Sequence, residues 1–439
     1  MLSQEDNELI TRVGPGTPMG VLLRHFWIPF LFGWEVTVDG PPERVRLLGE
    51  DLIVFRNSAG CVGLIAEHCP HRGAALFFGR NEENGLRCVY HGWKYDIAGR
   101  CVDMPSEHPE STFKERIRAR AYPCVERSGI VWAYLGPSDP PPPLPALEWL
   151  DLPADHHVGS KRVQYSNWVQ AIEGDIDQSH VSFVHSRLNL QEGAGPGRML
   201  IDEIRKADTH PRFEVIDTNY GVCIGAGREA PDGEHYWRIT QHLMPFHTMT
   251  GPYGPDPRRN WRAWVPIDDE TCFVIGLSFH PLRPITAQEQ EIADRRGSVW
   301  NISPPNREPK SSMAFGRWRP IPDLCNDFFI DRKVQRTQTY SGISEFWAQD
   351  AGPQLSMGRI VDRTQEHLGT SDTAIIAVRR RLLEAAKALG DEGKVPPQAH
   401  NPACYAVRGD AVLIPATQSW FDATIERRKV LTGVNPDCP

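Results

Sequence analysis

Several features that would place a chain of this length in a special class are missing from the sequence. No apolar run reaches the roughly 20 residues that a membrane-spanning helix needs, and the acidic start at Met1–Glu8 lacks the basic and apolar regions of a signal peptide. We therefore expect no membrane segment and a cytoplasmic location. Acidic residues outnumber basic ones by 56 to 48, for a formal net charge of −8, which argues against nucleic acid as a partner.

Internal repeats and nucleotide-binding fingerprints are missing as well. Without a flavin or nicotinamide motif, an enzyme of this sequence that consumes electrons needs a separate reductase to supply them. In a cytoplasmic protein the ten cysteines are seldom disulfides and more often metal ligands, catalytic groups or core residues. The sixteen histidines are the second unusual count, so spacing has to decide what these residues do.

One short segment divides the chain. Five of the six residues from Pro140 to Pro145 are proline, and such a stretch can sustain neither a helix nor an interior strand. It predicts an extended connector. We expect an N-terminal segment and a small domain in residues 1–145 and a larger domain in residues 146–439.

The residues before the connector are typical of short strands joined by glycine-rich turns, which predicts a small antiparallel β domain. After the connector the pattern is mixed. Strands are predicted at 213–222, 236–243, 262–266 and 272–279, and helices at 165–185, at 343–350 and from Asp372 to a stop at Gly390. The predicted class is α+β, with an antiparallel sheet flanked by helices in the second domain.

Two cysteine–histidine pairs lie close together in the first domain. Cys69 and His71 form a C-x-H pattern, and Cys88 and His91 form a C-x-x-H pattern. Two thiolates and two imidazoles can hold zinc or a Rieske-type [2Fe–2S] cluster, in which the cysteines bind one iron and the histidines the other. Tight glycine loops and nearby aromatic rings favour the cluster; these are Gly73, Gly92, Trp93 and Tyr95.

A second pattern, Asp-x-x-His-x-x-x-x-His, covers Asp177, His180 and His185. Residues five apart lie about 140° around an ideal helix, so the two imidazoles can meet at one ion only if the helix ends or bends between them. Asp177 and His180 are three apart and share a face. Taken alone, the pattern also fits an amphipathic helix with two incidental histidines.

Together the two patterns resemble those of the Rieske ring-hydroxylating oxygenases. The loops lack the extra cysteine of respiratory Rieske proteins. Other segments are similar to the phthalate-dioxygenase-type group of this family, whose members have α subunits only and form trimers or stacked trimers. These segments are Arg12–Gly20, Arg46–Leu52, Val102–Glu107 and Met357–Arg363.

The resemblance implies two cofactors and their ligands. A Rieske [2Fe–2S] cluster would be held by Cys69, His71, Cys88 and His91, and a mononuclear Fe(II) by His180, His185 and a carboxylate. Asp350 stands where the family places this carboxylate. The rival carboxylates are Glu345, Asp331 and Asp327.

The family also gives Asp177 a catalytic role. The resemblance implies that its carboxylate bridges His180 and a Rieske ligand of a neighbouring subunit, by analogy His91, and thereby couples the two metals. A homotrimer or stacked trimers without a β subunit would bring these groups together. O₂ and a separate reductase are the other implied partners.

The implied reaction is hydroxylation of an aromatic carboxylate, phthalate-like or a substituted benzoate, with cis-dihydroxylation preferred. Monooxygenation, O-demethylation or ether cleavage on the same iron remains an alternative, and so does an electron-transfer Rieske protein without oxygenase activity. A carboxylate in an apolar pocket needs a cation, and arginine offers a bidentate fork. Among Arg205, Arg212, Arg228 and Arg238 we favour Arg205 and Arg238; strand alternation places Arg238, Thr240 and His242 on one face.

Overall fold

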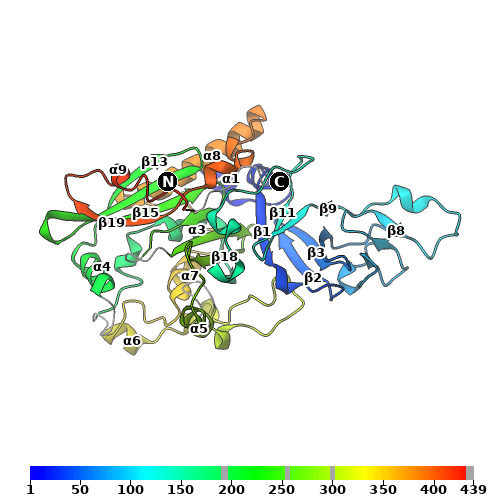
Figure 1. Cartoon of the computed structure of the whole chain (residues 1–439), viewed down its shortest axis with the longest axis horizontal. Coiled ribbons are helices and arrows are strands. Elements are labelled where there is room, and N and C mark those ends of the chain that lie inside the picture. The colour runs from blue at the N-terminus through cyan, green and yellow to red at the C-terminus, as the bar shows by residue number, and fades with distance from the viewer. Residues whose placement is uncertain (189–195, 253–257, 297–301, 432–439) are drawn as a thin grey trace.

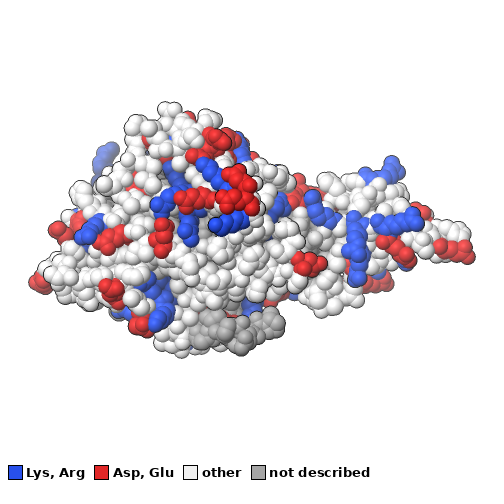
Figure 2. Space-filling model, turned by 90° about the horizontal axis from the view of Figure 1, so that it is seen from above, with Lys and Arg blue, Asp and Glu red and all other residues white. Residues whose placement is uncertain are grey.

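The computed structural model describes residues 1–188, 196–252, 258–296 and 302–431. The chain forms a broad body and a narrower arm, which lies to the right in Figure 1. Figure 2 shows a waist between them and acidic and basic side chains interspersed over this face. None of the described helices is long and apolar enough to span a membrane.

Two four-stranded antiparallel sheets build the arm. Their strand orders are β2-β3-β4-β9 and β5-β6-β7-β8. Ile53, Phe55 and Leu86 belong to a separate cluster that the two sheets share, while Val45 and Val54, on the other face of the first sheet, join the main core. The expected small antiparallel β domain is confirmed. The strands are β2 (Glu43–Leu47), β3 (Glu50–Arg56), β4 (Val62–Ala66), β5 (Arg80–Glu82), β6 (Gly85–Arg87), β7 (Lys94–Tyr95), β8 (Cys101–Asp103) and β9 (Ala121–Tyr122).

A three-stranded sheet joins the arm to the body. It has the order β1-β11-β10, with β1 at Trp27–Phe32, β10 at Cys124–Arg127 and β11 at Ile130–Tyr134. Trp132 of β11 is fully buried and packs 6.0 Å from the ring of Trp261 in the body. Residues 141–147 form neither helix nor strand, as the prolines predict, and the domain boundary at residue 145 stays a prediction.

An antiparallel eight-stranded sheet is the centre of the body, with the order β12-β18-β17-β16-β15-β14-β13 and β19 paired with β15. Alternate residues of β14 face opposite sides: Val222 and Ile224 join the main core, and Cys223 packs with Trp420 on the other side. The strands are β12 (His157–Gln164), β13 (Arg212–Asp217), β14 (Gly221–Glu229), β15 (Glu234–Leu243), β16 (His247–Met249), β17 (Arg259–Pro266), β18 (Cys272–Phe279) and β19 (Asp410–Pro415).

Helices flank this sheet, as expected for the α+β class (Figure 1). Helix α3 packs against β15 to β18, and α7 packs against α3. Near the start of the chain, α1 and α2 lie against α8, where Asp6 pairs with Lys387. The helices are α1 (Gln4–Thr11), α2 (Pro18–Arg24), α3 (Trp168–Ile176), α4 (Pro196–Ala207), α5 (Ala287–Arg296), α6 (Arg332–Thr337), α7 (Phe346–Ser356), α8 (Thr373–Glu392) and α9 (Trp420–Ala423).

Several predicted boundaries are wrong. The helix expected over 343–350 is α7, at Phe346–Ser356. The helix expected over 165–185 ends at Ile176, and Asp177 is extended with φ −73° and ψ 132°. The strand expected over 213–222 is interrupted by a turn between β13 and β14. Helix α8 continues through Gly390, because its left-handed end residue is Gly393 with φ 66°, a conformation that glycine adopts without strain.

Candidate metal centres

Two loops of the arm present the cysteine–histidine pairs and are built alike. In each, the cysteine N–H donates to the carbonyl five residues later, from Cys69 to Ala74 at 2.9 Å and from Cys88 to Trp93 at 2.8 Å. The glycine four residues after the cysteine donates back to the cysteine carbonyl. These glycines have φ of 79° and 80°, which a side chain would strain. The matching turns explain why glycine follows each pair.

The four side chains of these loops converge. The cysteines are buried at 3% exposure each, while the histidines are only half-buried. The imidazole rings of His71 and His91 lie 4.5 Å apart between centroids, and His71 stacks on Trp93 at 4.2 Å. Inner sulfurs and outer imidazoles fit a cluster with thiolates on one iron and neutral imidazoles on the other.

Tyr95 contacts one of the two cysteines of this site. Its hydroxyl lies 3.2 Å from Cys69 Sγ, and the side chain is fully buried. Burial, together with the bond to Cys69, raises the pKa of Tyr95 above its ordinary value. The hydroxyl therefore keeps its proton and donates to the sulfur whenever Cys69 is a thiolate.

In the body, the end of α3 positions the second pattern. Asp177 accepts hydrogen bonds from the backbone N–H groups of Ser179, at 2.6 Å, and His180, at 3.3 Å. This Asx turn stops the helix, and one 3₁₀ turn follows over His180–Ser182. The two histidines therefore lie after the helix, where the spacing of a continuous helix does not apply to them.

Three of the predicted ligands meet at one point. His180 Nε2 and His185 Nε2 lie 3.4 and 3.0 Å from Asp350 Oδ1, which comes from α7. The three ligand atoms all lie within 4.8 Å of one another, and no other such group of three occurs among the described His, Cys, Asp and Glu residues. Two imidazoles and one carboxylate on one side of a point are the donor set of non-heme Fe(II) sites.

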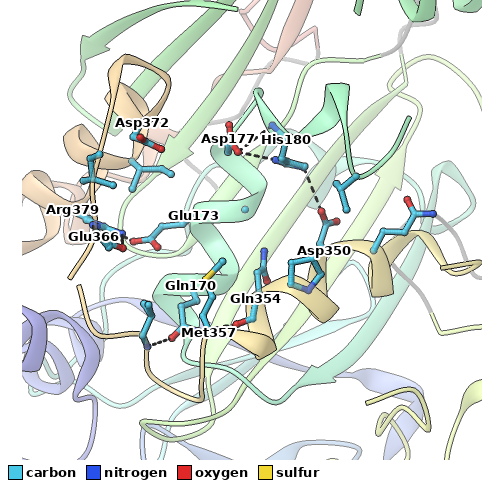
Figure 3. Close-up of a pocket in the computed structure, with 17 residues that line it drawn as sticks. Gln170, Glu173, Asp177, His180, Asp350, Gln354, Met357, Glu366, Asp372 and Arg379 are labelled. Atoms are coloured by element: carbon cyan, nitrogen blue, oxygen red, sulfur yellow. Dashed lines mark hydrogen bonds and ion pairs between the residues drawn. The ribbon is translucent and has the colours of Figure 1, made fainter. Parts of the chain in front are cut away.

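The side chains and backbone groups around Asp350 and Asp177 keep both carboxylates charged. Burial alone would raise the pKa of Asp350, but His185, His180 and Arg162 together lower it. Burial opposes ionisation of Asp177 too, and its bonds to His180 and to backbone N–H groups lower its pKa. Asp177 Oδ2 lies 3.1 Å from His180 Nδ1, which leaves Nε2 of the same ring directed at Asp350. Figure 3 shows this chain from Asp177 through His180 to Asp350.

The rival carboxylates have other contacts. Glu345 accepts from Asn306 Nδ2 at 2.6 Å and also bonds Ser303 and Trp347. Asp331 accepts from two backbone N–H groups at the start of α6. Asp327 lies in a 3₁₀ segment with φ 50°. Of the candidate carboxylates, the structure brings only Asp350 to the two histidines.

A cavity of about 250 Å³ lies beside Asp177. Its lining includes His180 and Asp350 at one end (Figure 3). At the other end Glu173 is held by Arg379 at 2.6 Å and Arg363 at 3.3 Å. Asp177 and His180 keep side-chain exposures of 22% and 24%, so this end of α3 is open to whatever fills the cavity.

Of the predicted substrate arginines, Arg238 contacts the loop that follows Asp177. Arg238 is buried in β15, and its Nη1 donates to Gln178 Oε1 at 2.8 Å, directly after Asp177. Arg228 of β14 donates to the Gln178 carbonyl at 2.5 Å, and burial, with the charges of Arg205 and Arg238, lowers its pKa to about 10. Arg205 is buried near the end of α4, whereas Arg212 is exposed and paired with Glu214.

Sequence reasoning missed two contacts of this region. It assigned no role to Gln178, which both buried arginines of β14 and β15 contact. It also assigned none to Gln349, which contacts His185. A signal was present in both cases, because each glutamine adjoins a predicted site carboxylate in sequence.

Two family models match the chain. One, described as the Rieske [2Fe-2S] domain, covers residues 26–123. The other, described as LigXa C-terminal domain like, covers residues 133–437.

Known relatives align along most of the chain. The 3-chlorobenzoate-3,4-dioxygenase oxygenase subunit of Comamonas testosteroni is 37% identical over 97% of this chain and 99% of its own. The phthalate 4,5-dioxygenase oxygenase subunit of Pseudomonas putida is 35% identical over 88% and 87%. The 5,5'-dehydrodivanillate O-demethylase oxygenase subunit of a Sphingobium strain is 33% identical over 87% and 80%.

Solved structures share the fold. The oxygenase in the reduced oxygenase–ferredoxin complex of carbazole 1,9a-dioxygenase has a TM-score of 0.54 at 20% identity, over 91% of this chain and 97% of that one. Dicamba monooxygenase bound to dicamba has a TM-score of 0.55 at 17% identity, over 84% and 98%.

Proposed function

The chain belongs to the Rieske non-heme iron oxygenases, and we propose that it hydroxylates an aromatic carboxylate with O₂ and with electrons from a separate reductase. The family carries a Rieske [2Fe–2S] cluster and a mononuclear iron, and this chain is accordingly an oxygenase component rather than an electron carrier alone. When bound, the iron activates O₂ and the cluster supplies electrons. The observation that carries the proposal is the convergence of His180, His185 and Asp350. The buried Arg238 donates to Gln178, two residues before His180.

We assign the metal ligands by position. Cys69, His71, Cys88 and His91 hold the cluster, and His180, His185 and Asp350 hold the iron. The closeness of the imidazole rings at 4.5 Å and of the iron-site donor atoms within 4.8 Å supports both assignments. Each set contains the donor types that its group prefers.

Asp177 is proposed as the link between the two metals. In Figure 1 the arm and the helices α3 and α7 lie well apart within one chain, so an electron from the cluster of the same chain would have a long way to travel. The arm of a neighbouring copy, with His91 placed at the cavity beside Asp177, would shorten the path. This supports a homotrimer or stacked trimers, in which Asp177 orients His180 and accepts from the neighbouring imidazole.

The proposed substrate class suits the chemistry of arginine. Arg238 and Arg205 lie at 4% and 8% exposure, and a guanidinium group offers a carboxylate a bidentate fork. Relatives named for chlorobenzoate and phthalate point to the same chemistry. A carboxylate held by Arg238 would orient the ring while Asp350 and the two histidines hold the iron.

The decisive experiment compares acids with their uncharged esters. Oxygen uptake and products are measured for phthalate isomers, halobenzoates and methoxybenzoates, and then for the methyl ester of the best acid. Hydrogen peroxide is assayed in parallel, so that uptake without product is recognised. We expect the acid to give product and the ester little. Equal turnover of the ester would contradict the carboxylate assignment.

Product analysis also separates the reaction types. A cis-diol means dioxygenation, which we favour because two relatives are dioxygenases of benzoate-type acids. Formaldehyde and a phenol from a methoxybenzoate mean O-demethylation, the reaction named for one relative. Metal analysis tests the electron-carrier alternative, since about three irons per chain are expected for cluster plus mononuclear site and about two for a cluster alone.

A further inference from the structure

His185 is held on two sides by the helix that carries Asp350. Its ring stacks on Phe346 with 4.0 Å between centroids and 10° between planes. Its Nδ1 lies 2.8 Å from Gln349 Oε1, and its Nε2 lies 3.0 Å from Asp350 Oδ1. Three residues of α7 therefore contact His185: Phe346 at the face of the ring, Gln349 at Nδ1 and Asp350 at Nε2.

The orientation of the Gln349 amide follows from its second contact. Gln349 Nε2 donates to the carbonyl of Ile343 at 2.8 Å. An amide nitrogen cannot accept a hydrogen bond and an amide oxygen cannot donate one, so Oε1 is the atom that faces His185. The proton of the neutral imidazole is then on Nδ1, and the lone pair of Nε2 points toward Asp350.

We propose that Gln349 is a positioning residue that fixes the tautomer and the direction of His185 and thereby sets the affinity of the site for Fe(II). The proposal rests on the iron-binding role given to His180, His185 and Asp350 under the proposed function. Metal-bound histidines are commonly held through their second ring nitrogen, and loss of that partner weakens metal binding. At His180 this partner is the carboxylate of Asp177.

A neutral partner suits the deeper histidine. The side chain of His185 is 7% exposed, against 24% for His180. A carboxylate at position 349 would add a third negative charge beside Asp350 and Asp177 where water screens little, and burying an excess charge is costly. The amide accepts the same hydrogen bond without that cost.

The test measures Fe(II) affinity in protein that retains its cluster. The mononuclear iron is removed, and Fe(II) is titrated back against a chromophoric chelator for wild type, Gln349→Met, Gln349→Glu and Gln354→Met. Gln349→Met loses the acceptor at His185, whereas Gln349→Glu keeps it but loses the donor to Ile343. Gln354→Met is the matched control, because it removes a buried amide further along α7 that accepts from Gln164 instead.

We expect Gln349→Met to weaken Fe(II) binding by about 10- to 100-fold, Gln349→Glu to recover most of the affinity, and Gln354→Met to leave it unchanged. In Co(II)-loaded protein, one exchangeable imidazole N–H proton resonance should exchange faster in Gln349→Met alone. Wild-type affinity in Gln349→Met overturns the proposal. Equal losses in both Gln349 variants, or in Gln354→Met, also overturn it, because packing of α7 would then set the affinity. Wild type that takes up no Fe(II) here would instead overturn the proposed function itself.

Discussion

Replacing Tyr95 by phenylalanine should lower the reduction potential of the cluster. The hydroxyl lies 3.2 Å from Cys69 Sγ in a fully buried position, and the raised pKa of Tyr95 keeps it a donor. Reduction adds negative charge to the cluster, so this hydrogen bond stabilises the reduced form more than the oxidised one. Phenylalanine keeps the ring and its packing and removes only the donor.

The size of the change follows from hydrogen-bond energies. A bond to a charged group contributes about 1.5–3 kcal/mol and a neutral one about 0.5–1.5 kcal/mol, so the two redox states differ by about 1–1.5 kcal/mol. For one electron, a tenfold change in equilibrium, about 1.4 kcal/mol, corresponds to about 59 mV. The potential of the variant should therefore fall by about 40–65 mV.

Redox titration of the cluster, followed by its visible absorption, measures this shift. Tyr122→Phe is the matched control, because Tyr122 is in the same domain but donates to Glu50 at 2.8 Å and not to a cluster ligand. Its potential should stay at the wild-type value. A Tyr95→Phe variant with an unchanged or higher potential, and an intact cluster, would refute the reasoning.

Three further outcomes are expected. Asp177→Asn should keep both metals but reduce product formation by about 100-fold, and full turnover in that variant would exclude the bridging role. Arg238→Ala should raise KM for the aromatic acid about 10- to 100-fold at unchanged iron content, whereas the exposed Arg212→Ala should not; equal KM values would remove Arg238 from the substrate site. Burial, with a smaller effect from His242, lowers the pKa of His247 to about 3, so its stability contribution is complete above pH 6.5 and declines below it, by about 1.4 kcal/mol at pH 5.5. Urea unfolding at pH 7.5 and 5.5 should show a smaller acid loss in His247→Phe, and an unchanged loss would contradict the burial argument.

Local patterns singled out side chains that the structure brings close together in the arm and after α3. The two matching C-x-H and C-x-x-H loops and the Asp-x-x-His pattern depend on residues close in sequence, so their spacing carried the information. Helix geometry alone showed that His180 and His185 cannot meet within one continuous helix. In the structure α3 ends before both of them, at Ile176, and only a short 3₁₀ turn follows at His180–Ser182.

Contacts that join distant parts of the chain could not be read from such patterns. The hydrogen bond from His185 to Gln349 spans 164 residues. The position of Gln349 next to Asp350 placed it near the site but did not identify which side chain it contacts. The pairing of β19 with β15 was missed for the same reason, as strand partners depend on the tertiary fold. Gly390 was expected to end a helix, yet α8 runs two residues further, to Glu392, and ends at the left-handed Gly393.

The position of β19 in the sheet also constrains the order in which the protein can form during synthesis. Arg238 of β15 pairs with Ala411 of β19. The strand that carries this proposed substrate contact can therefore complete its pairing only after residues near the end of the chain have been synthesised. The core of the arm, in contrast, draws its buried residues from positions 53 to 119. The arm can therefore close, and its four cluster-site side chains can converge, while the ribosome is still adding the residues that complete the catalytic sheet.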